Sequence, residues 1–334
     1  MIYLAVDVGT TNTRVWLLEK TRILEHIQRP VGVHNAAISG DSSLLSRTLS
    51  DAIKSLLKNT HSQPRFVLAA GMITSAQGLY EVPHVVAPAG KEELSQKVRM
   101  KTFAEICACP FFLIPGVRTK PAPSQLESIE QTDVIRGEES EIVGLQIRKK
   151  LSVPWLFFHL GSHTKAIQVD ENGHIVRSVS TLAGECFDAL RTQTILSEHL
   201  KKLTKAKLSE KFFLRGSQHA NHSGLLRTLF MVRLLGENRR YSQSELYSFL
   251  LGALIASDFQ AIERSQILGR RPAQILVSGH PNLQRAWGLI LKSKNCRLTT
   301  VGRRESEAAL LDGLRAIVFS SPLFMKNIGV VQTG

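Results

Sequence analysis

The sequence has no long apolar run, few cysteines and few aromatic residues, and each shortage excludes a class of protein. No stretch approaches the roughly 18 uncharged apolar residues that a membrane-spanning helix needs. The four cysteines, Cys107, Cys109, Cys186 and Cys296, form no CxxC pair and have no histidine cluster at zinc spacing. We therefore expect reduced thiols and no structural metal. The chain also enters a strand pattern without a signal-like segment, so we expect a cytoplasmic protein that binds no membrane.

Acidic residues are also in short supply. The 42 Lys and Arg residues outnumber the 28 Asp and Glu residues, which gives a formal net charge of +14. Such an excess favours an anionic partner. The basic residues are scattered as pairs, such as Arg239–Arg240 and Arg303–Arg304, and the 6% of aromatic residues do not interleave with them as in a nucleic-acid surface. We therefore expect a small anionic ligand and no nucleic acid.

What the sequence does contain is an alternation of strand and helix patterns, typical of an α/β protein. Its 334 residues, 43% of them hydrophobic, suffice for about two domains of ordinary size. Three short strands joined by tight turns are predicted at Ile2–Val6, Arg14–Leu18 and Ile23–Gln28. An amphipathic helix follows, with Ser42 or Ser43 as its N-cap. A buried strand that ends in a glycine turn is predicted at 65–72, and another strand at 111–114.

At Trp155 this pattern starts again. The stretch "WLFFHLGSHTKAIQV", the turn "DENG" and the stretch "HIVRSVS" repeat the order of apolar run, glycine and hydroxyl turn, apolar run and third strand. Aligning Gly161 on Gly9 gives an offset of 152 (161 − 9) and pairs Thr10 with Ser162. We interpret this as an internal duplication, with domains at 1–150 and 151–334 that face each other across a cleft.

The rest of the second half reads as helices and two strands. Helices are predicted at 185–203, 223–236, 242–263, 281–291 and 305–319, and strands at 273–279 and 297–301. The apolar helices between Leu225 and Ile262 can pack within the chain or across a homo-oligomer interface, and internal packing is the simpler expectation.

The two hairpin turns carry residues suited to phosphate. After Gly9, the amides and hydroxyls of Thr10 and Thr11 can point at phosphate oxygens, which turns a hairpin into an anion-binding nest. Asp7 beside them can hold Mg²⁺ through water, because this ion takes few protein carboxylates when phosphates supply the rest. One such turn is equally typical of a solvent-facing hairpin. Two related turns, each opening a domain, favour a bound nucleotide.

The turns resemble the two phosphate loops of the sugar kinase, heat-shock ATPase and actin superfamily. The whole chain also resembles the 2-dehydro-3-deoxygalactonokinase family in an ordered set of motifs: "DVGTTNTRVW", "GMITSAQGLYEVPH", "PGV", "DVIRGEESEIVGL", "GSHTK", "LAGECFDAL" and "LFMVRLLG". This resemblance implies a two-lobed actin-like ATPase fold, with duplicated ribonuclease H-like lobes and a central nucleotide cleft. It further implies an ATP- and Mg²⁺-dependent kinase that phosphorylates the terminal (6-) hydroxyl of 2-dehydro-3-deoxy-D-galactonate, a small sugar acid of galactonate catabolism.

The resemblance also suggests roles for individual residues. Asp7 is the predicted metal-binding residue. The predicted phosphate and nucleotide contacts are Gly9, Thr10, Thr11, Gly161, Ser162, His163, Thr164, Lys165 and, near the adenosine, Gly279. A carboxylate at the start of the connecting helix orients the attacking oxygen in related proteins, so Glu139 is the predicted base and Glu138 the alternate. The predicted sugar-acid contacts are Arg14, Gln77, Glu81, His84 and Arg136. Acidic residues in a first helical turn also simply complement the helix dipole.

Three positions depart from the family pattern. Ala76 stands where an Arg is usual, while Leu79 and Ala166 each stand where a Trp is usual. Losing a guanidinium removes a bidentate partner for anions, and losing indoles removes a stacking surface. A different sugar acid, or a nucleotide-binding protein without turnover, therefore stays open. So does a phosphohydrolase of the same fold, similar to exopolyphosphatase, whose connecting helix also starts with a Gly-Glu-Glu stretch.

Overall fold

The chain folds as two compact units. The computed structural model describes residues 1–41, 43–121, 125–200, 206–269, 274–292 and 297–328. The first unit holds Met1–Leu151, Asn172–Arg177 and the chain from Arg304 onward; the second holds Ser152–Glu171 and Ser178–Arg303. Ser42 and Cys296, which the sequence analysis considered, lie outside the described residues.

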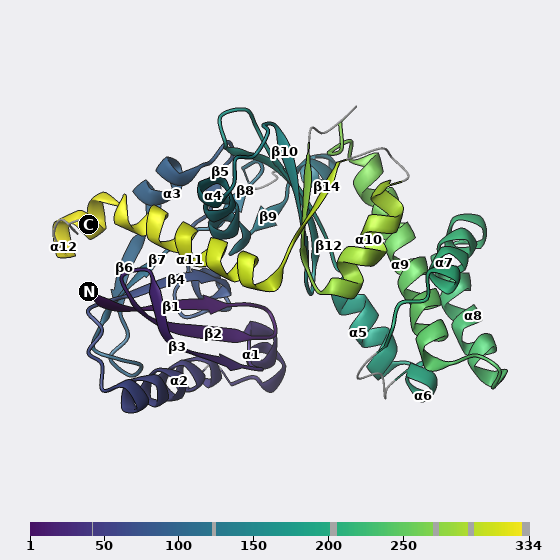
Figure 1. Cartoon of the computed structure of the whole chain (residues 1–334), viewed down its shortest axis with the longest axis horizontal. Coiled ribbons are helices and arrows are strands. Elements are labelled where there is room, and N and C mark those ends of the chain that lie inside the picture. The colour runs from purple at the N-terminus through teal and green to yellow at the C-terminus, as the bar shows by residue number, and fades with distance from the viewer. Residues whose placement is uncertain (42, 122–124, 201–205, 270–273, 293–296, 329–334) are drawn as a thin grey trace. The chain divides into compact units, whose positions relative to one another are not determined.

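The first unit is built on a six-stranded sheet of order β3-β2-β1-β4-β7-β6 (Figure 1). Its strands are β1 (Ile2–Val8), β2 (Thr13–Glu19), β3 (Arg22–Arg29), β4 (Val67–Gly71), β6 (Arg99–Thr102) and β7 (Pro110–Leu113). The three N-terminal strands pair antiparallel, as predicted, whereas β1, β4 and β7 run parallel to one another. The carboxyl ends of these parallel strands therefore meet at one edge of the sheet.

Side-chain alternation gives this sheet two buried faces. Alternate residues of β1, among them Leu4 and Val6, join one core cluster with the apolar stripe of α2 (Leu44–Thr60). The residues between them face the other way, where Tyr3 contacts Phe66 and Phe319. Phe319 belongs to α11 (Arg303–Phe319), so helices from opposite ends of the chain cover the sheet.

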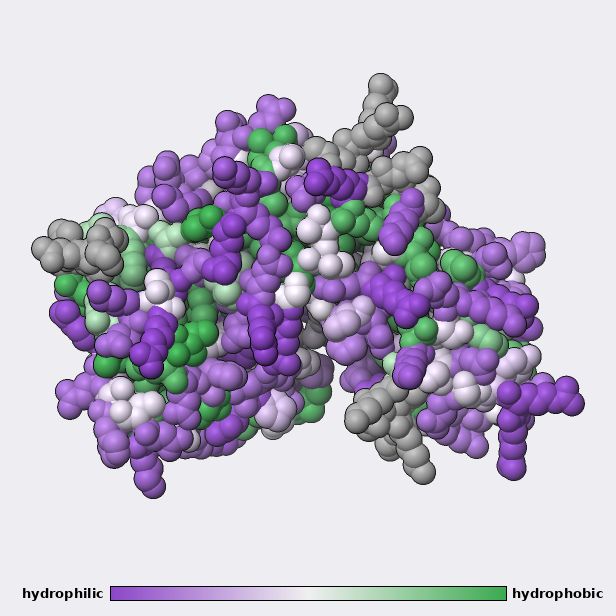
Figure 2. Space-filling view, in the orientation of Figure 1, coloured by the Kyte–Doolittle hydropathy of each residue, from purple (hydrophilic) through white to green (hydrophobic). Residues whose placement is uncertain are grey.

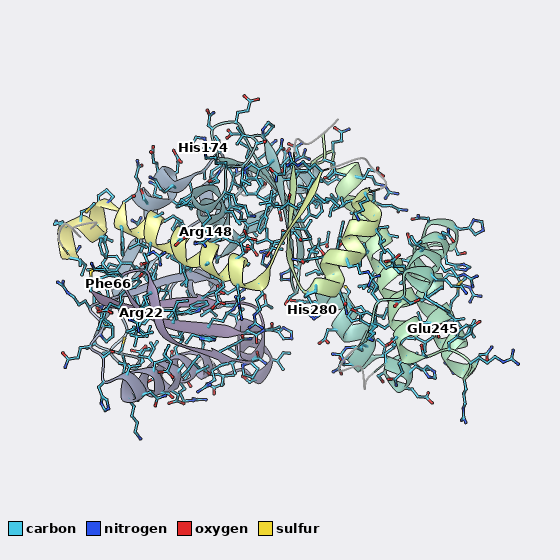
Figure 3. All side chains as sticks on the ribbon, viewed as in Figure 1. Arg22, Phe66, Arg148, His174, Glu245 and His280 are labelled. Atoms are coloured by element: carbon cyan, nitrogen blue, oxygen red, sulfur yellow. The ribbon has the colours of Figure 1, made fainter. Side chains whose placement is uncertain are left out.

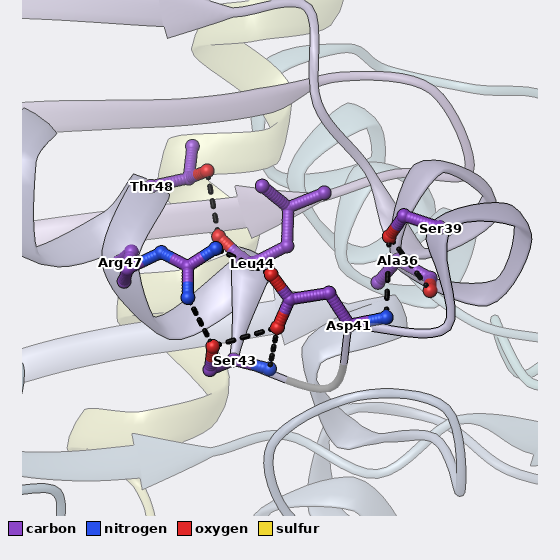
Figure 4. Close-up of polar contacts among 7 residues, drawn as sticks. All are labelled: Ala36, Ser39, Asp41, Ser43, Leu44, Arg47 and Thr48. Atoms are coloured by element: carbon purple, nitrogen blue, oxygen red, sulfur yellow. Dashed lines mark hydrogen bonds and ion pairs between the residues drawn. The ribbon is translucent and has the colours of Figure 1, made fainter.

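The start of α2 is stabilised by a residue that the sequence analysis did not single out. Ser43 occupies the N-cap position but makes no side-chain cap bond. Instead, Asp41 accepts hydrogen bonds from the backbone and hydroxyl of Ser43, at 2.9 and 2.7 Å, and pairs with Arg47 (Figure 4). The hydrogen bonds from Ser43 and Arg47 lower the pKa of Asp41 to about 2. An exposed carboxylate thus closes the turn in front of the helix.

In the first unit, the helix that carries the predicted base packs tightly against a C-terminal helix. A Cβ atom on Gly144 of α4 (Glu138–Arg148) would lie 1.7 Å from the carbonyl oxygen of Ala309 in α11. A Cβ atom on Gly313 would lie 1.8 Å from the carbonyl oxygen of Ser140. The two helices therefore touch backbone to backbone at Ser140, in the first turn of α4, and again at Gly144. Helix α11, predicted within the C-terminal domain at 151–334, packs in the first unit.

Shorter elements complete the first unit. They are α1 (Val33–Ser39), η1 (Met72–Thr74), α3 (Lys91–Lys97), η2 (Leu126–Gln131), α12 (Pro322–Ile328) and a small sheet of β5 (Val85–Val86), β8 (Val117–Arg118) and β9 (Val134–Ile135).

The second unit repeats the sheet plan of the first. Its sheet has the order β12-β11-β10-β13-β14, with strands β10 (Trp155–Leu160), β11 (Thr164–Val169), β12 (Ile175–Thr181), β13 (Ile275–Gly279) and β14 (Leu298–Val301). The strand β10 pairs antiparallel with β11 and parallel with β13, as β1 pairs with β2 and β4. Each strand of the order β3-β2-β1-β4-β7 thus has a counterpart in the second sheet. This is the duplicated ribonuclease H-like topology predicted from the sequence.

Within the described residues, the helices of the second unit are α5 (Ala183–Gln193), α6 (Ser197–Leu200), α7 (Glu210–Ser223), α8 (Leu225–Glu237), α9 (Gln243–Arg264) and α10 (Pro281–Lys292). Helix α10 packs against β13 and β14, whereas α6, α7 and α8 pack against α9. The single helix predicted at 185–203 is wrong, because the chain breaks between α5 and α6; residues 201–203 lie outside the described part. The Thr194 hydroxyl donates to the carbonyl of Leu190 and accepts from the amide of Leu196. These local bonds compete with continuation of the helix.

No single helix in the described ranges is long and apolar enough to cross a membrane, although the bent pair α11 and α12 meets that criterion jointly. Hydrophilic side chains cover most of the face shown in Figure 2, and hydrophobic ones appear there in small patches.

Candidate active site

The first hairpin turn, between β1 and β2, is held by its carbonyl groups. The amide of Gly9 donates to the carbonyl of Asn12 at 2.8 Å, which closes the turn. The carbonyls of Gly9 and Thr10 accept from the amides of Val33 and His34 at the start of α1. Among the described residues, the amides of Thr10 and Thr11 have no hydrogen-bond partner. A turn whose carbonyls are used and whose amides are free is suited to an anion.

Asp7 lies at the carboxyl end of β1, directly before this turn. Its carboxylate is largely buried and lies 3.6 Å from the guanidinium of Arg14, its cross-strand neighbour on β2. The Oδ1 atom is also close to two glycines: Cβ atoms built on Gly71 and Gly137 would lie 2.9 and 3.9 Å from it. Asp7 therefore faces both the end of β4 and the start of α4, and Arg14 already has an anionic partner within the protein.

The two glutamates predicted as base candidates begin α4. Both carboxylate oxygens of Glu139 accept from the amide of Gly137, at 2.9 and 2.7 Å, while Glu138 accepts from the amide of Arg136 at 3.0 Å. Gly137 itself packs against Gly71, next to Asp7. Three carboxylates of the first unit are thus gathered where β1, β4 and α4 meet.

Burial changes the acidity of Glu139. The side chain is completely buried, and desolvation together with the neighbouring Glu138 raises its pKa to about 7. The hydrogen bonds from the backbone and the positive charge of Arg136 act in the opposite direction without cancelling this effect. A carboxylate with such a pKa exchanges a proton near neutral pH, as a general base must.

The side chain of Arg136 is hydrogen-bonded to other residues of the protein. Its guanidinium donates to the Thr74 hydroxyl at 2.6 Å, to the carbonyl of Val82 at 3.1 Å and to the ring of His84 at 3.0 Å. Burial lowers its pKa, although Glu139 and Glu81 oppose this shift. Three of its five donors thus tie the loop after β4 to the residue before Gly137. The structure gives Arg136 an internal role that its prediction as a sugar-acid contact did not include.

The loop after β4 presents the remaining predicted sugar contacts. Gln77 and Glu81 are exposed, whereas His84 is half-buried. Burial, Arg136 and Arg118 lower the pKa of His84 to about 4, so the ring is neutral near pH 7. Of the positions that depart from the family pattern, Ala76 is exposed and Leu79 is half-buried in this loop. In the second unit, Ala166 is wholly buried in the core with Trp287, so its small side chain affects packing there.

The second hairpin turn, between β10 and β11, repeats the construction of the first. The amide of Gly161 donates to the carbonyl of His163, and the carbonyl of Ser162 accepts from the amide of Glu185 at the start of α5. His163 pairs with Glu185 at 3.2 Å, and Lys165 is half-buried on β11. The predicted phosphate contacts of the second half therefore lie together on one turn and its following strand.

The second unit has a cavity beside this turn, with a volume of about 330 Å³. Gly161, Ser162 and Thr164 line it from the hairpin, and Tyr247 and Leu251 line it from α9. His280, which follows Gly279 at the start of α10, also lines it (Figure 3). Most of the lining is apolar, which suits a flat heterocyclic base better than a phosphate chain.

Several residues of these sites escaped the sequence analysis. Gly279 was among the predicted contacts, whereas Gly71, which ends the equivalent strand of the first unit, was not. A Cβ atom on either would lie within 2.4 Å of a carbonyl oxygen on the neighbouring strand, Val8 or Leu160. Gly32 and Gly184 are likewise equivalent, since each packs against its hairpin turn. Applying the offset of 152 to Gly32 would have found Gly184. No local signal marks Thr74, Tyr247 or Trp287, because only tertiary packing brings them to the sites.

Comparison with known proteins agrees with these features. The model of the family described as 2-keto-3-deoxy-galactonokinase matches residues 7–317. The chain is 24% identical over 318 residues to the 2-dehydro-3-deoxygalactonokinase of Escherichia coli strain K12, covering 94% of this chain and 97% of that protein.

The fold has a counterpart among solved structures. A crystal structure of a Sinorhizobium meliloti protein assigned as a 2-dehydro-3-deoxygalactonokinase superposes with a TM-score of 0.75, at 21% identity, over 94% of this chain and 96% of the other. The predicted fold class, an actin-like ATPase fold of two ribonuclease H-like units, is confirmed. The family model spans nearly all of the sequence, so the chain belongs to the 2-keto-3-deoxy-galactonokinase family.

Proposed function

We propose that this protein is an ATP-dependent kinase that phosphorylates the terminal hydroxyl of a 2-dehydro-3-deoxy sugar acid, with 2-dehydro-3-deoxy-D-galactonate as the acceptor. One observation carries the proposal: a buried carboxylate with a pKa of about 7, Glu139, begins α4 beside Asp7 at the end of β1. Phosphoryl transfer to an alcohol needs a base and a group that holds the metal. Family membership supports the acceptor class, because the relatives named above carry that activity in their names.

In the proposed reaction, Glu139 takes the proton from the acceptor's terminal hydroxyl. The hydroxyl oxygen forms a bond to the γ-phosphorus of ATP as the bond between that phosphorus and the bridging oxygen breaks, which releases ADP. Glu138 is the alternate base, because 8% of its surface is exposed whereas Glu139 is fully buried. The amides of Thr10 and Thr11 bind phosphate oxygens, and their fixed positions save the reorganisation that water would require.

The residues present fit Mg²⁺ as well as ATP. Asp7 is a single buried carboxylate next to free amides, and Mg²⁺ uses one or two protein carboxylates when phosphates and water supply its other ligands. Asp7 would hold the ion through water, and the bound ion would neutralise charge on the phosphates. The cavity of the second unit would take the adenosine. A kinase that draws on ATP and a catabolic sugar acid would work in the cytoplasm.

Two alternatives have less support. A phosphohydrolase of the exopolyphosphatase type would need no nucleoside pocket, yet the second unit has an apolar cavity beside its hairpin turn. The family match does not favour it either. A nucleotide-binding protein without turnover would not need a base, yet Glu139 has the acidity of one.

The test is Mg²⁺-dependent ADP release by the purified protein, with no acceptor, with 2-dehydro-3-deoxygalactonate and with its gluconate epimer. We expect release that depends on an acceptor, a product heavier by one phosphoryl group, and loss of both in Asp7→Ala and Glu139→Gln. The ratio of the two acids identifies the substrate. ATP binding without stimulation by either acid would overturn this acceptor class.

A further inference from the structure

The first unit also contains a cavity, which takes no part in the reaction proposed above. Its volume is about 360 Å³, and residues 82–86, Lys97 and Arg99 line it. Among the described residues of this lining none is acidic, and two carry positive charge: Lys97 and Arg99.

The strand pairing places these cations at the functional edge of the sheet. Lys97 ends α3, and Arg99 begins β6, where it lies opposite Leu113, the last residue of β7. The carboxyl end of β7 lies at the same sheet edge as the carboxyl ends of β1 and β4, which carry Asp7 and Gly71 (Figure 1). The cations and the acids of the first unit thus share one edge, and ligands of open α/β sheets bind at that edge.

His84 is the residue of the cavity wall that contacts Arg136. Its ring contacts the guanidinium of Arg136, and Arg118 also acts on it electrostatically. These charges and burial keep the ring neutral near pH 7. Both ring nitrogens of His84 lie close to one guanidinium nitrogen of Arg136, Nδ1 at 3.3 Å and Nε2 at 3.0 Å. The wall therefore combines two cations, Lys97 and Arg99, with a neutral ring held by Arg136, and this set suits an anion.

We propose that this cavity binds the carboxylate end of the sugar acid, with Lys97 and Arg99 supplying the positive charge. The proposal rests on the function proposed above. The acceptor carries its charge at one end and its reacting hydroxyl at the other. Asp7, Glu138 and Glu139 repel a carboxylate, so the charged end must lie away from them.

Arg136 joins the two regions. Its backbone precedes Gly137, beside Asp7, and its guanidinium holds His84 in the wall of the cavity. The single side chain of Arg136 therefore reaches from the acids to the wall. Two other arginines near the acids already have partners within the protein: Arg136 is bonded to Thr74 and Val82, and Arg14 is paired with Asp7.

The test measures binding and turnover of the acid and of its uncharged methyl ester. In Lys97→Met and Arg99→Met we expect the KM and the calorimetric Kd for the acid to rise at least about tenfold, as for loss of a charge-assisted contact. For the ester, the KM and the Kd should stay close to their wild-type values. Matched controls are Lys91→Met, at the exposed start of α3, and Arg22→Met, on the exposed end of β3 (Figure 3), and both should behave as wild type.

The outcomes separate this proposal from the proposed function. Acid binding that weakens in Lys97→Met and Arg99→Met supports the subsite even if the wild-type protein transfers no phosphoryl group, in which case only the kinase proposal fails. Unchanged constants for the acid, an equal rise for the ester, or no binding of the acid by the wild-type protein would each overturn the subsite.

Discussion

The two units of this protein have the same strand order and the same glycine-ended strands, yet they hold different chemistry. The first gathers Asp7, Glu138 and Glu139 around the end of β1. The second has a mostly apolar cavity of about 330 Å³ beside its hairpin turn. The residue of the second unit that corresponds to Asp7 is His159. Asp7 precedes Val8, which packs on Gly71, and His159 precedes Leu160, which packs on Gly279. The same strand plan therefore carries different side chains at equivalent positions of the two units.

The largest expected effect comes from the position that differs most between the units. Asp7→Asn removes the carboxylate proposed to hold the metal, which is worth several kcal/mol, so we expect kcat to fall about 10³-fold. His159→Asn, at the equivalent strand position, should change kcat less than threefold. Steady-state ADP release measures both. Equal losses in the two variants would contradict the division of roles between the units.

Replacing the base should lower activity and raise stability. Glu139→Gln should lower kcat about 10²-fold, and in the wild-type protein kcat/KM should rise with pH through about 7 as Glu139 loses its proton. The matched variant Glu138→Gln should keep that pH profile. If Glu138→Gln removes the profile instead, the alternate base is the correct one.

The stability effect has a defined sign. The raised pKa means that the folded protein holds the Glu139 proton more tightly than the unfolded chain does, so wild-type stability falls as pH rises from about 4.5 to about 7. Gln has no such cost. The gain of Glu139→Gln over wild type should be about 2 kcal/mol larger at pH 8 than at pH 5, measured by urea denaturation. An equal gain at both pH values would show that the group is not buried as described.

Helix glycines should respond oppositely in the two units. Gly313→Ala forces a Cβ atom onto the backbone of Ser140 in the first turn of α4, which should cost about 1–3 kcal/mol and lower kcat. Gly288→Ala, in α10 of the second unit, meets open space and should stabilise by about 0.5–1 kcal/mol with no change in kcat. Thermal unfolding and ADP release test the pair. A neutral Gly313→Ala would show that α11 does not hold α4 closely.

The smallest effect concerns the nucleotide alone. Ala183 lines the cavity of the second unit, so Ala183→Leu should raise the KM for ATP about tenfold, a loss of about 1.4 kcal/mol. Ala189→Leu, at an exposed position of the same helix, is the control and should leave the KM unchanged. A rise in the KM for the sugar acid instead would reassign the cavity.

The repeated pattern in the sequence made much of the fold predictable. The glycine and hydroxyl turns marked both hairpins, and the acidic stretch after Arg136 marked the start of α4 at Glu138, because these features are local. The partnership of α11 with the first unit has no local signal, since it depends on contacts between residues such as Ser140 and Gly313, far apart in the chain. Helix α7 was missed, although its Phe213 is buried in the core of the second unit.

Site chemistry was harder to predict than site position. The sequence indicated that Arg136 would lie near the acids. It did not indicate whether the guanidinium of Arg136 binds a ligand or other residues of the protein. Tertiary structure decides this, because Thr74, Val82 and His84 come from another loop. The acidity of Glu139 likewise follows from complete burial, which the first turn of a helix does not by itself imply.

The most direct test of the division of roles is calorimetric binding of a non-hydrolysable ATP analogue to the wild-type protein, Glu139→Gln and Ala183→Leu. We expect wild-type affinity for Glu139→Gln, which loses turnover, and about tenfold weaker binding for Ala183→Leu. Weakened binding in Glu139→Gln together with unchanged binding in Ala183→Leu would contradict this division of roles.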